Sequence, residues 1–219
     1  MFIGHFAVAF AAKRTAPAAS LGTLILAAQF LDGLWPVFLL LGIERVEIRP
    51  GDTAFTPLNF VHYPISHSFA MTLVWAALFA LGYAWFARNV RVALVAAVLV
   101  ASHWVLDWLT HRPDLPLYPG DSDPVGLGLW NSVPATLGIE SLMFVAGLAV
   151  YLKATRARNR TGTLGLWALI AFLLVAYLGA AFGPPPPDVR ALAWTALAGW
   201  LFVAWGYWID RNREPRTQS

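Results

Sequence analysis

Three residues that could bind a metal ion recur at every fourth position within one apolar part of the chain. His103, Asp107 and His111 are spaced i, i+4 and i+8, so a helix would place them along one face. Imidazole and carboxylate groups one turn apart are ligands that zinc and similar divalent cations use. The spacing therefore predicts a metal site, and a polar seam that hydrogen-bonds neighbouring helices is the alternative interpretation.

Further ionisable residues interrupt other apolar stretches. Asp32 and Glu140 lie within two of them, and His67 begins a third. At a helical rise of about 1.5 Å per residue, Asp32, His103 and Glu140 each lie roughly 18–20 Å from the basic end of their own stretch. Ionisable groups at membrane depth are costly and therefore indicate function. We expect these side chains to converge on one cavity. His5, in the N-terminal apolar segment, and His62, just before the stretch that His67 begins, are further candidates.

The elements that carry these residues must be membrane helices. The chain has 219 residues, of which 58% are hydrophobic and only 12% are charged. A soluble domain has about 25% charged residues, so this chain cannot cover a water-exposed surface of its size with charge. It contains no cysteine, which excludes disulfides and thiolate ligands.

The apolar stretches define the expected topology. A membrane-spanning helix needs about 20 mostly apolar residues. Met1–Ala12 is shorter and lacks a basic start and a cleavage site, so we expect a short inserted helix rather than a signal peptide. The sequence predicts an all-α membrane bundle over residues 1–208 and a solvated cytoplasmic tail over residues 209–219. Six stretches qualify as spans: Ser20–Leu41, Ile65–Phe86, Val92–Leu109, Ser132–Leu152, Leu164–Phe182 and Ala191–Trp208.

The basic residues are distributed unevenly between the two sides of the predicted bundle. Of the 15 lysines and arginines, only Arg45, Arg49, Arg112 and Arg190 fall on the side nearer the candidate site. Cytoplasmic connections carry the excess of Lys and Arg, so this side is expected to face outward and the C-terminus to be cytoplasmic. The net charge of +3 is then an orientation signal, and we expect no nucleic-acid partner.

The order of the motifs resembles that of a known family. Gly4-His5, Asp32, His-x-x-x-Ser-His-Ser at residues 62–68 and His-x-x-x-Asp at residues 103–107 occur in sequence. Over about half the chain they resemble bacterial inner-membrane proteins of the YdjM type, a family predicted to contain metal-dependent hydrolases distantly related to zinc-dependent phospholipase C. The resemblance implies one tightly held zinc with a weaker second ion, because the family's second acidic residue is replaced by Leu34. It implies that the metal ligands, or their close partners, are His5, Asp32, His67, His103 and Asp107.

The combined pattern favours a membrane-embedded, zinc-type hydrolase in the bacterial inner membrane. Its expected substrate is an ester or phosphoester of an amphiphilic, lipid-like molecule at the outer leaflet. Glu140 is the expected general base, because it lies at the depth of the ligands. His62 and His111 are expected at the mouth, where they would bind a headgroup or move protons, and Arg112 would bind a phosphate.

Two other functions also fit the residues. Chains of His and Asp across membrane helices occur in proton- or metal-ion-coupled transporters. Residues 92–101 and 147–152, the basic-side halves of two predicted helices, contain no ionisable group, which disfavours such a path. A non-catalytic scaffold would enclose its metal, whereas a catalytic site keeps an open position. The sequence does not define the substrate or the oligomeric state.

Overall fold

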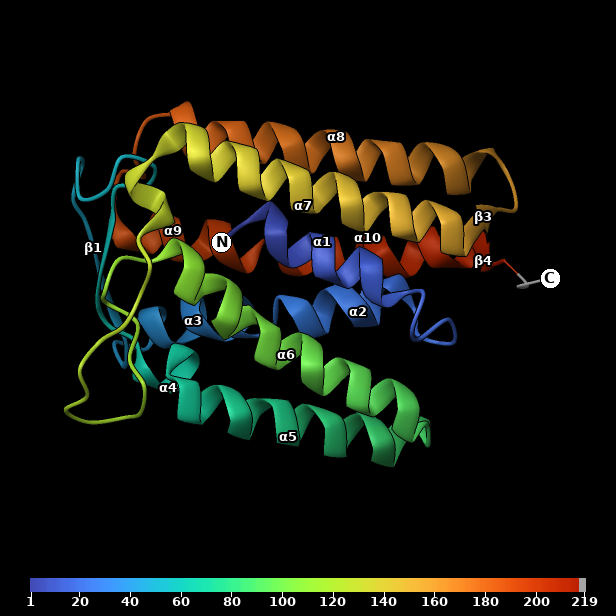
Figure 1. Ribbon diagram of the computed structural model, residues 1–219, viewed down its shortest axis with the longest axis horizontal. Coiled ribbons are helices and arrows are strands. Elements are labelled where there is room, and N and C mark those ends of the chain that lie inside the picture. Colours follow the sequence, from blue (N-terminus) through green and yellow to red (C-terminus); the bar gives the residue numbers. More distant parts are fainter. Residues whose placement is uncertain (217–219) are drawn as a thin grey trace.

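The computed structural model describes residues 1–216 as a bundle of helices aligned along one long axis (Figure 1). Within these residues five segments are long and apolar enough to cross a membrane, and a bent pair adds a sixth candidate. The prediction of an all-α membrane bundle is confirmed. The five segments are α5 (Phe69–Ala87), α6 (Val90–Thr110), α7 (Val133–Ala154), α8 (Arg160–Phe182) and Val189–Arg211, which comprises α9 (Val189–Leu197) and α10 (Trp200–Arg211).

The bent pair consists of α2 (Leu21–Ala28) and α3 (Phe30–Leu40), which meet at Gln29 with an angle of 55°. In a continuous helix the carbonyl of Ala28 would accept a hydrogen bond from the N–H four residues later. Here it accepts one from the ring of His103 on α6, at 2.7 Å. The break therefore joins this span to α6 and places Asp32 in the first turn of α3.

The short helix α1 (Ile3–Ala12) occupies the centre of the bundle, and the amino terminus lies inside it rather than at one end (Figure 1). Ile3, Phe6 and Phe10 are fully or almost fully buried. A Cβ at Gly147 would lie 2.2 Å from the carbonyl oxygen of Ala7, so the glycine lets α7 approach the backbone of α1. The expectation that this segment inserts into the bundle is met.

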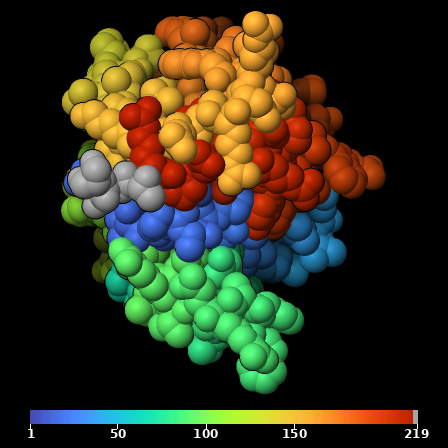
Figure 2. All heavy atoms as spheres, turned by 90° about the vertical axis from the view of Figure 1, so that its right-hand side faces the viewer, coloured from blue at the N-terminus to red at the C-terminus, as the bar shows by residue number. Residues whose placement is uncertain are grey.

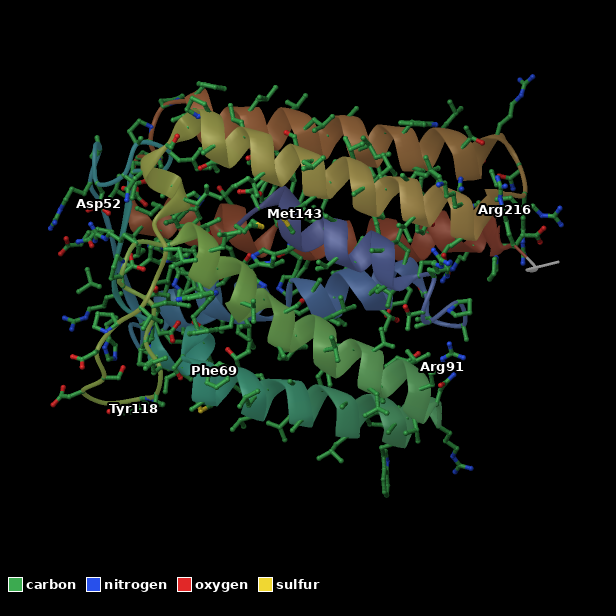
Figure 3. All side chains as sticks on the ribbon, viewed as in Figure 1. Asp52, Phe69, Arg91, Tyr118, Met143 and Arg216 are labelled. Carbon is green, nitrogen blue, oxygen red and sulfur yellow. The ribbon has the colours of Figure 1, made fainter. Side chains whose placement is uncertain are left out.

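Small antiparallel strand pairs close the two ends of the molecule. At one end β1 (Arg45–Ile48) pairs with β2 (Leu58–His62), which leads into the one-turn helix α4 (Pro64–His67). At the other end β3 (Thr155–Ala157) pairs with β4 (Arg213–Pro215). Figure 3 shows Asp52 and Tyr118 at the first end, here called the loop end, and Arg91 and Arg216 at the second, the basic end.

Viewed from the basic end, the molecule has two unequal parts (Figure 2). The green connection between α5 and α6 projects away from the rest of the surface, and blue N-terminal residues separate it from the orange and red C-terminal half. N-terminal residues thus lie between the two parts at this end of the molecule.

Several predicted boundaries differ from the structure; the span expected from Leu164, for example, begins at Arg160. The span expected from Ile65 begins at Phe69, because Ser68 is extended and its side chain caps α5 by accepting from the N–H of Met71. The tail expected from residue 209 is not solvated at its start. Ile209 is buried within α10, and the buried Arg213 donates to the hydroxyl of Thr155 at 3.0 Å. The last three residues of that tail, 217–219, lie outside the described residues.

Candidate metal centre

Four predicted ligands meet near the middle of the bundle, and we call Asp32, His67, His103 and Asp107 the inner cluster. Nε2 of His67 lies 3.5 Å from Oδ1 of Asp32 and 3.8 Å from Oδ2 of Asp107. Nε2 of His103 lies 3.6 Å and 3.1 Å from the same two oxygens. The ligand atoms of Asp32, His67 and His103, from α3, α4 and α6, all lie within 4.8 Å of one another, and Asp107 approaches the two histidines from a further side.

The four histidine–aspartate distances are close to those between neighbouring ligands of a tetrahedral ion. Zinc bound at about 2.0–2.2 Å has ligand atoms roughly 3.3–3.6 Å apart. The four distances above, from 3.1 to 3.8 Å, scatter around that range. The donors, two imidazole nitrogens and two carboxylate oxygens, also suit zinc or a similar divalent cation. The geometry and chemistry of the inner cluster therefore fit a metal ion.

The backbone fixes the ring of His103. A carbonyl oxygen can only accept, so Nδ1 carries the proton that it donates to Ala28 at 2.7 Å. Nε2 is buried and has no hydrogen-bond partner within the described residues, although it lies 3.1 Å from Oδ2 of Asp107. With the ring neutral, the Nε2 lone pair faces carboxylate oxygens that also carry lone pairs. Either a proton on Nε2 or a metal cation between these atoms makes the arrangement favourable.

A hydroxyl and a second carboxylate support His67. Nδ1 of His67 lies 2.7 Å from Oγ of Ser66, and Oγ donates to Oε2 of Glu44 at 2.6 Å. Oε1 of Glu44 accepts from the backbone N–H of Ser66 at 2.7 Å. Metal-binding histidines are usually oriented in this way through their other ring nitrogen.

His5 lies beside the inner cluster and contacts the opposite oxygen of Asp107. Its Nε2 is 3.1 Å from Oδ1 of Asp107, and its ring stacks on that of His103 at 3.7 Å. The amino group of Met1 lies 2.5 Å from the same Oδ1. His5, His103 and Asp107 are close enough to form a second three-ligand group, but His103 has one free ring nitrogen and can serve one ion.

Exposure differs sharply among the four members of the inner cluster. The side chains of His67, His103 and Asp107 are at most 5% exposed, whereas that of Asp32 is 42% exposed. Asp32 lies directly after the break between α2 and α3. The inner cluster is therefore exposed on the side of Asp32, near the bend between α2 and α3.

Glu140 supports the N-terminus of α1. Its Oε2 accepts from the backbone N–H groups of Phe2 and Gly4, at 2.9 and 3.2 Å, which a helix start leaves without partners. Its Oε1 is buried without a hydrogen bond in the described residues. Glu140 therefore positions His5 through α1, and one of its oxygens remains available.

His111 departs from the predicted stripe. α6 ends at Thr110, and His111 is extended. Pro113 follows two residues later and disfavours helical backbone at Arg112, so the helix cannot continue. Its Nδ1 donates to Oδ1 of Asp114 at 2.9 Å, and its ring packs on Trp130.

Tyr63 also donates a hydrogen bond to Asp114. Burial, followed by the charge of Asp114, raises the pKa of the Tyr63 phenol, which therefore stays protonated. These residues belong to a separate group, here called the outer cluster: Asp52, Tyr63, His111, Arg112 and Asp114.

Two residues expected at the mouth of the site have other surroundings. Arg112 donates to Oδ1 of Asp52 at 2.8 Å and to Oδ2 of Asp114 at 3.3 Å, so its charge is already paired. His62 is exposed at the end of β2, opposite Arg45. The structure thus places neither residue in the inner cluster.

The sequence analysis missed Glu44 and Ser66. Glu44 follows a span and precedes β1, a position where an acidic residue is ordinarily solvated, yet it is 2% exposed. Ser66 was noted only as part of the His-containing motif. An available signal was that Ser66 directly precedes a predicted ligand, since hydroxyls often hold the second nitrogen of a ligating imidazole.

A comparison with protein families identifies the chain. The family model described as YdjM inner membrane protein matches residues 1–185. The chain belongs to this family. It is accordingly a multi-pass protein of the bacterial inner membrane, in agreement with its apolar helices. No curated protein and no solved structure matches it. The family description names a location and no reaction, and the matched region contains the entire inner cluster.

Proposed function

We propose that this YdjM-family protein is a metal-dependent hydrolase whose zinc ion is held by Asp32, His67, His103 and Asp107. One observation carries the proposal: the free Nε2 of His103 faces two carboxylates and makes no hydrogen bond within residues 1–216. A divalent cation would make these lone pairs compatible and would balance the two carboxylate charges.

Some residues around the proposed ion would bind it, and another would take part in proton transfer. A bound zinc ion would lower the pKa of its water to about 7 and polarise the oxygen under attack. His67, His103 and Asp107 are buried and would fix the geometry. Oε1 of Glu140 is buried and unpaired in the described residues, so Glu140 remains the candidate for accepting a proton.

The position of the opening favours an amphiphilic substrate. Asp32 is the exposed member of the inner cluster and lies within a membrane span, at its bend. A substrate that reaches this side chain must enter at bilayer depth, as an ester or phosphoester of a lipid-like molecule could. His111 and Arg112 are engaged in the outer cluster and are left out of this proposal.

We also propose that the loop end faces outward, because the basic end carries most of the lysines and arginines. The chain contains no cysteine, so single cysteines report topology directly. Asp121→Cys, in the exposed loop after α6, is expected to react with an impermeant thiol reagent in intact spheroplasts. Arg158→Cys, at the basic end, is expected to react only after lysis, and the reverse pattern would contradict this orientation.

The function is tested with full-length protein purified in detergent. We expect about one zinc per chain, and zinc-dependent cleavage of one member of a panel of fluorogenic lipid esters, phosphomonoesters and phosphodiesters. Removal of the metal should abolish cleavage, and zinc should restore it. Asp107→Asn should lack both zinc and activity, whereas Asp123→Asn, an exposed loop carboxylate, should retain both. Absence of bound zinc in the wild-type protein would contradict the proposal, as would activity that survives Asp107→Asn.

A further inference from the structure

A buried carboxylate at the loop end reaches the inner cluster through a single hydroxyl. Glu44 lies between α3 and β1, where the backbone N–H groups of Ile43 and Glu44 donate to the carbonyl of Phe38 at 2.9 and 3.2 Å. Its side chain is turned inward to Ser66, and the residue is 2% exposed. Burying a carboxylate is costly unless its oxygens are hydrogen-bonded, and both oxygens of Glu44 are.

The hydrogen bonds determine which nitrogen of His67 carries the proton. A carboxylate only accepts, so Glu44 receives the backbone N–H of Ser66 at 2.7 Å and its hydroxyl proton at 2.6 Å. The Ser66 hydroxyl has one proton, which is now used, so Oγ can only accept from Nδ1 of His67 at 2.7 Å. Nδ1 of His67 is therefore protonated, and Nε2 of the neutral ring has a free lone pair.

We propose that Glu44 and Ser66 set the tautomer of His67 and thereby direct its Nε2 lone pair at Asp32 and Asp107. Glu44 is a positioning residue that acts from the segment between α3 and β1, outside the helices that carry the ligands. The inference rests on the proposed function only in taking His67 as a ligand. The proton arrangement itself can be measured without metal.

An isosteric substitution reverses the chain of hydrogen bonds. In Glu44→Gln the amide oxygen can still accept from the backbone N–H of Ser66, and the amide nitrogen then faces Oγ as a donor. The Ser66 hydroxyl must then donate to Nδ1 of His67, which places the ring proton on Nε2. Ser66→Ala breaks the chain without imposing the wrong tautomer, and Glu44→Asp retains a carboxylate as acceptor.

The experiment combines ¹⁵N NMR of histidine-labelled protein, prepared without metal, with titration by Zn²⁺ alone. His67 is assigned by its absence in His67→Ala. We expect an Nδ1–H signal in the wild-type protein and in Glu44→Asp, an Nε2–H signal in Glu44→Gln and a mixture in Ser66→Ala. Zinc affinity should fall roughly 10–100-fold in Glu44→Gln and less in Ser66→Ala. Glu47→Gln, on the exposed face of the same hairpin, should match the wild type in both measurements.

The two measurements separate the two proposals. An unchanged tautomer and zinc affinity in Glu44→Gln would overturn the positioning role. An equal loss of affinity in Ser66→Ala and Glu44→Gln, with one tautomer in both, would also overturn it, because that is the signature of a general packing defect. A tautomer change in protein that binds no zinc would support the positioning role while contradicting the metal-dependent function. If Glu44→Gln does not fold, the tautomer mixture expected in Ser66→Ala decides the question.

Discussion

The inner and outer clusters both bring histidine and aspartate side chains together, yet they differ in how the imidazole nitrogens and carboxylate oxygens are paired. In the outer cluster, Nδ1 of His111 donates to a carboxylate oxygen of Asp114, and Arg112 supplies a compensating positive charge. In the inner cluster, the free Nε2 of His103 faces two carboxylates without a hydrogen bond in the described residues. In the first arrangement the histidine and the carboxylate are joined by a hydrogen bond, and in the second the imidazole and carboxylates are placed as the ligands of a cation would be.

Paired donors and acceptors indicate a structural network, and converging lone pairs indicate a ligand set. The residue types alone do not distinguish the two clusters, because His103 and His111 lie on the same apolar segment with aspartates nearby. What separates them is the direction of each hydrogen bond. One oxygen of Asp52 has no partner among the described residues, but its other oxygen is bound by Arg112.

The largest expected effect comes from replacing one histidine of each cluster by alanine and comparing the two variants. His103→Ala should reduce zinc affinity by more than about 100-fold, the upper range for residues that only support a ligand. His111→Ala should leave zinc affinity unchanged and lower the free energy of unfolding by about 1–3 kcal/mol, because Asp114 loses a buried donor. Zinc titration and denaturation of both variants in detergent check this. Equal losses of affinity would contradict the distinction between the clusters.

A smaller effect is expected when the outer cluster loses the positive charge of Arg112. Arg112→Met leaves the buried carboxylate of Asp52 without its partner. We expect the free energy of unfolding to fall by about 2–3 kcal/mol, somewhat less than for a fully buried pair because Arg112 is partly exposed. Arg49→Met, which removes an exposed pair with Glu47, is the matched control and should cost at most about 1 kcal/mol. Zinc affinity should be unchanged in both variants. A lower zinc affinity in Arg112→Met would show that the outer cluster contributes to metal binding, against the distinction drawn here.

The smallest effect is expected at His62, which belongs to neither cluster. His62→Ala removes an exposed ring at the end of β2. Zinc affinity should remain at the wild-type value, and the free energy of unfolding should change by no more than about 0.5 kcal/mol, as for most surface substitutions. Reduced zinc affinity would show that the loop end rearranges around the metal.

The membrane helices and the convergence of the residues of the inner cluster could both be predicted from the sequence. Hydropathy marks the spans, and the spacing of His103 and Asp107 follows from the helical repeat. Their meeting with Asp32 and His67 was expected from depth and from the shared motif order. The ligand roles of these four residues stay predictions until metal is measured.

The remaining features depend on tertiary contacts that have weak local signals. The break at Gln29 has no glycine or proline at its apex, and it coincides with the hydrogen bond from His103 to Ala28. Glu44 resembles a solvated loop residue in the sequence, yet it is buried in the structure, where Ser66 donates to both of its oxygens. The end of α6 before His111 could have been predicted locally, since Pro113 disfavours helical backbone at Arg112 directly before it.

The most direct test of the central claim is the zinc K-edge X-ray absorption spectrum of zinc-loaded wild-type protein. The inner cluster predicts only nitrogen and oxygen ligands at about 2.0–2.2 Å, with the outer-ring scattering of two imidazoles. His67→Ala should remove one imidazole contribution, and His111→Ala should leave the spectrum unchanged. A spectrum with no imidazole contribution, or one that His67→Ala does not alter, would contradict the assignment of the inner cluster as a metal centre.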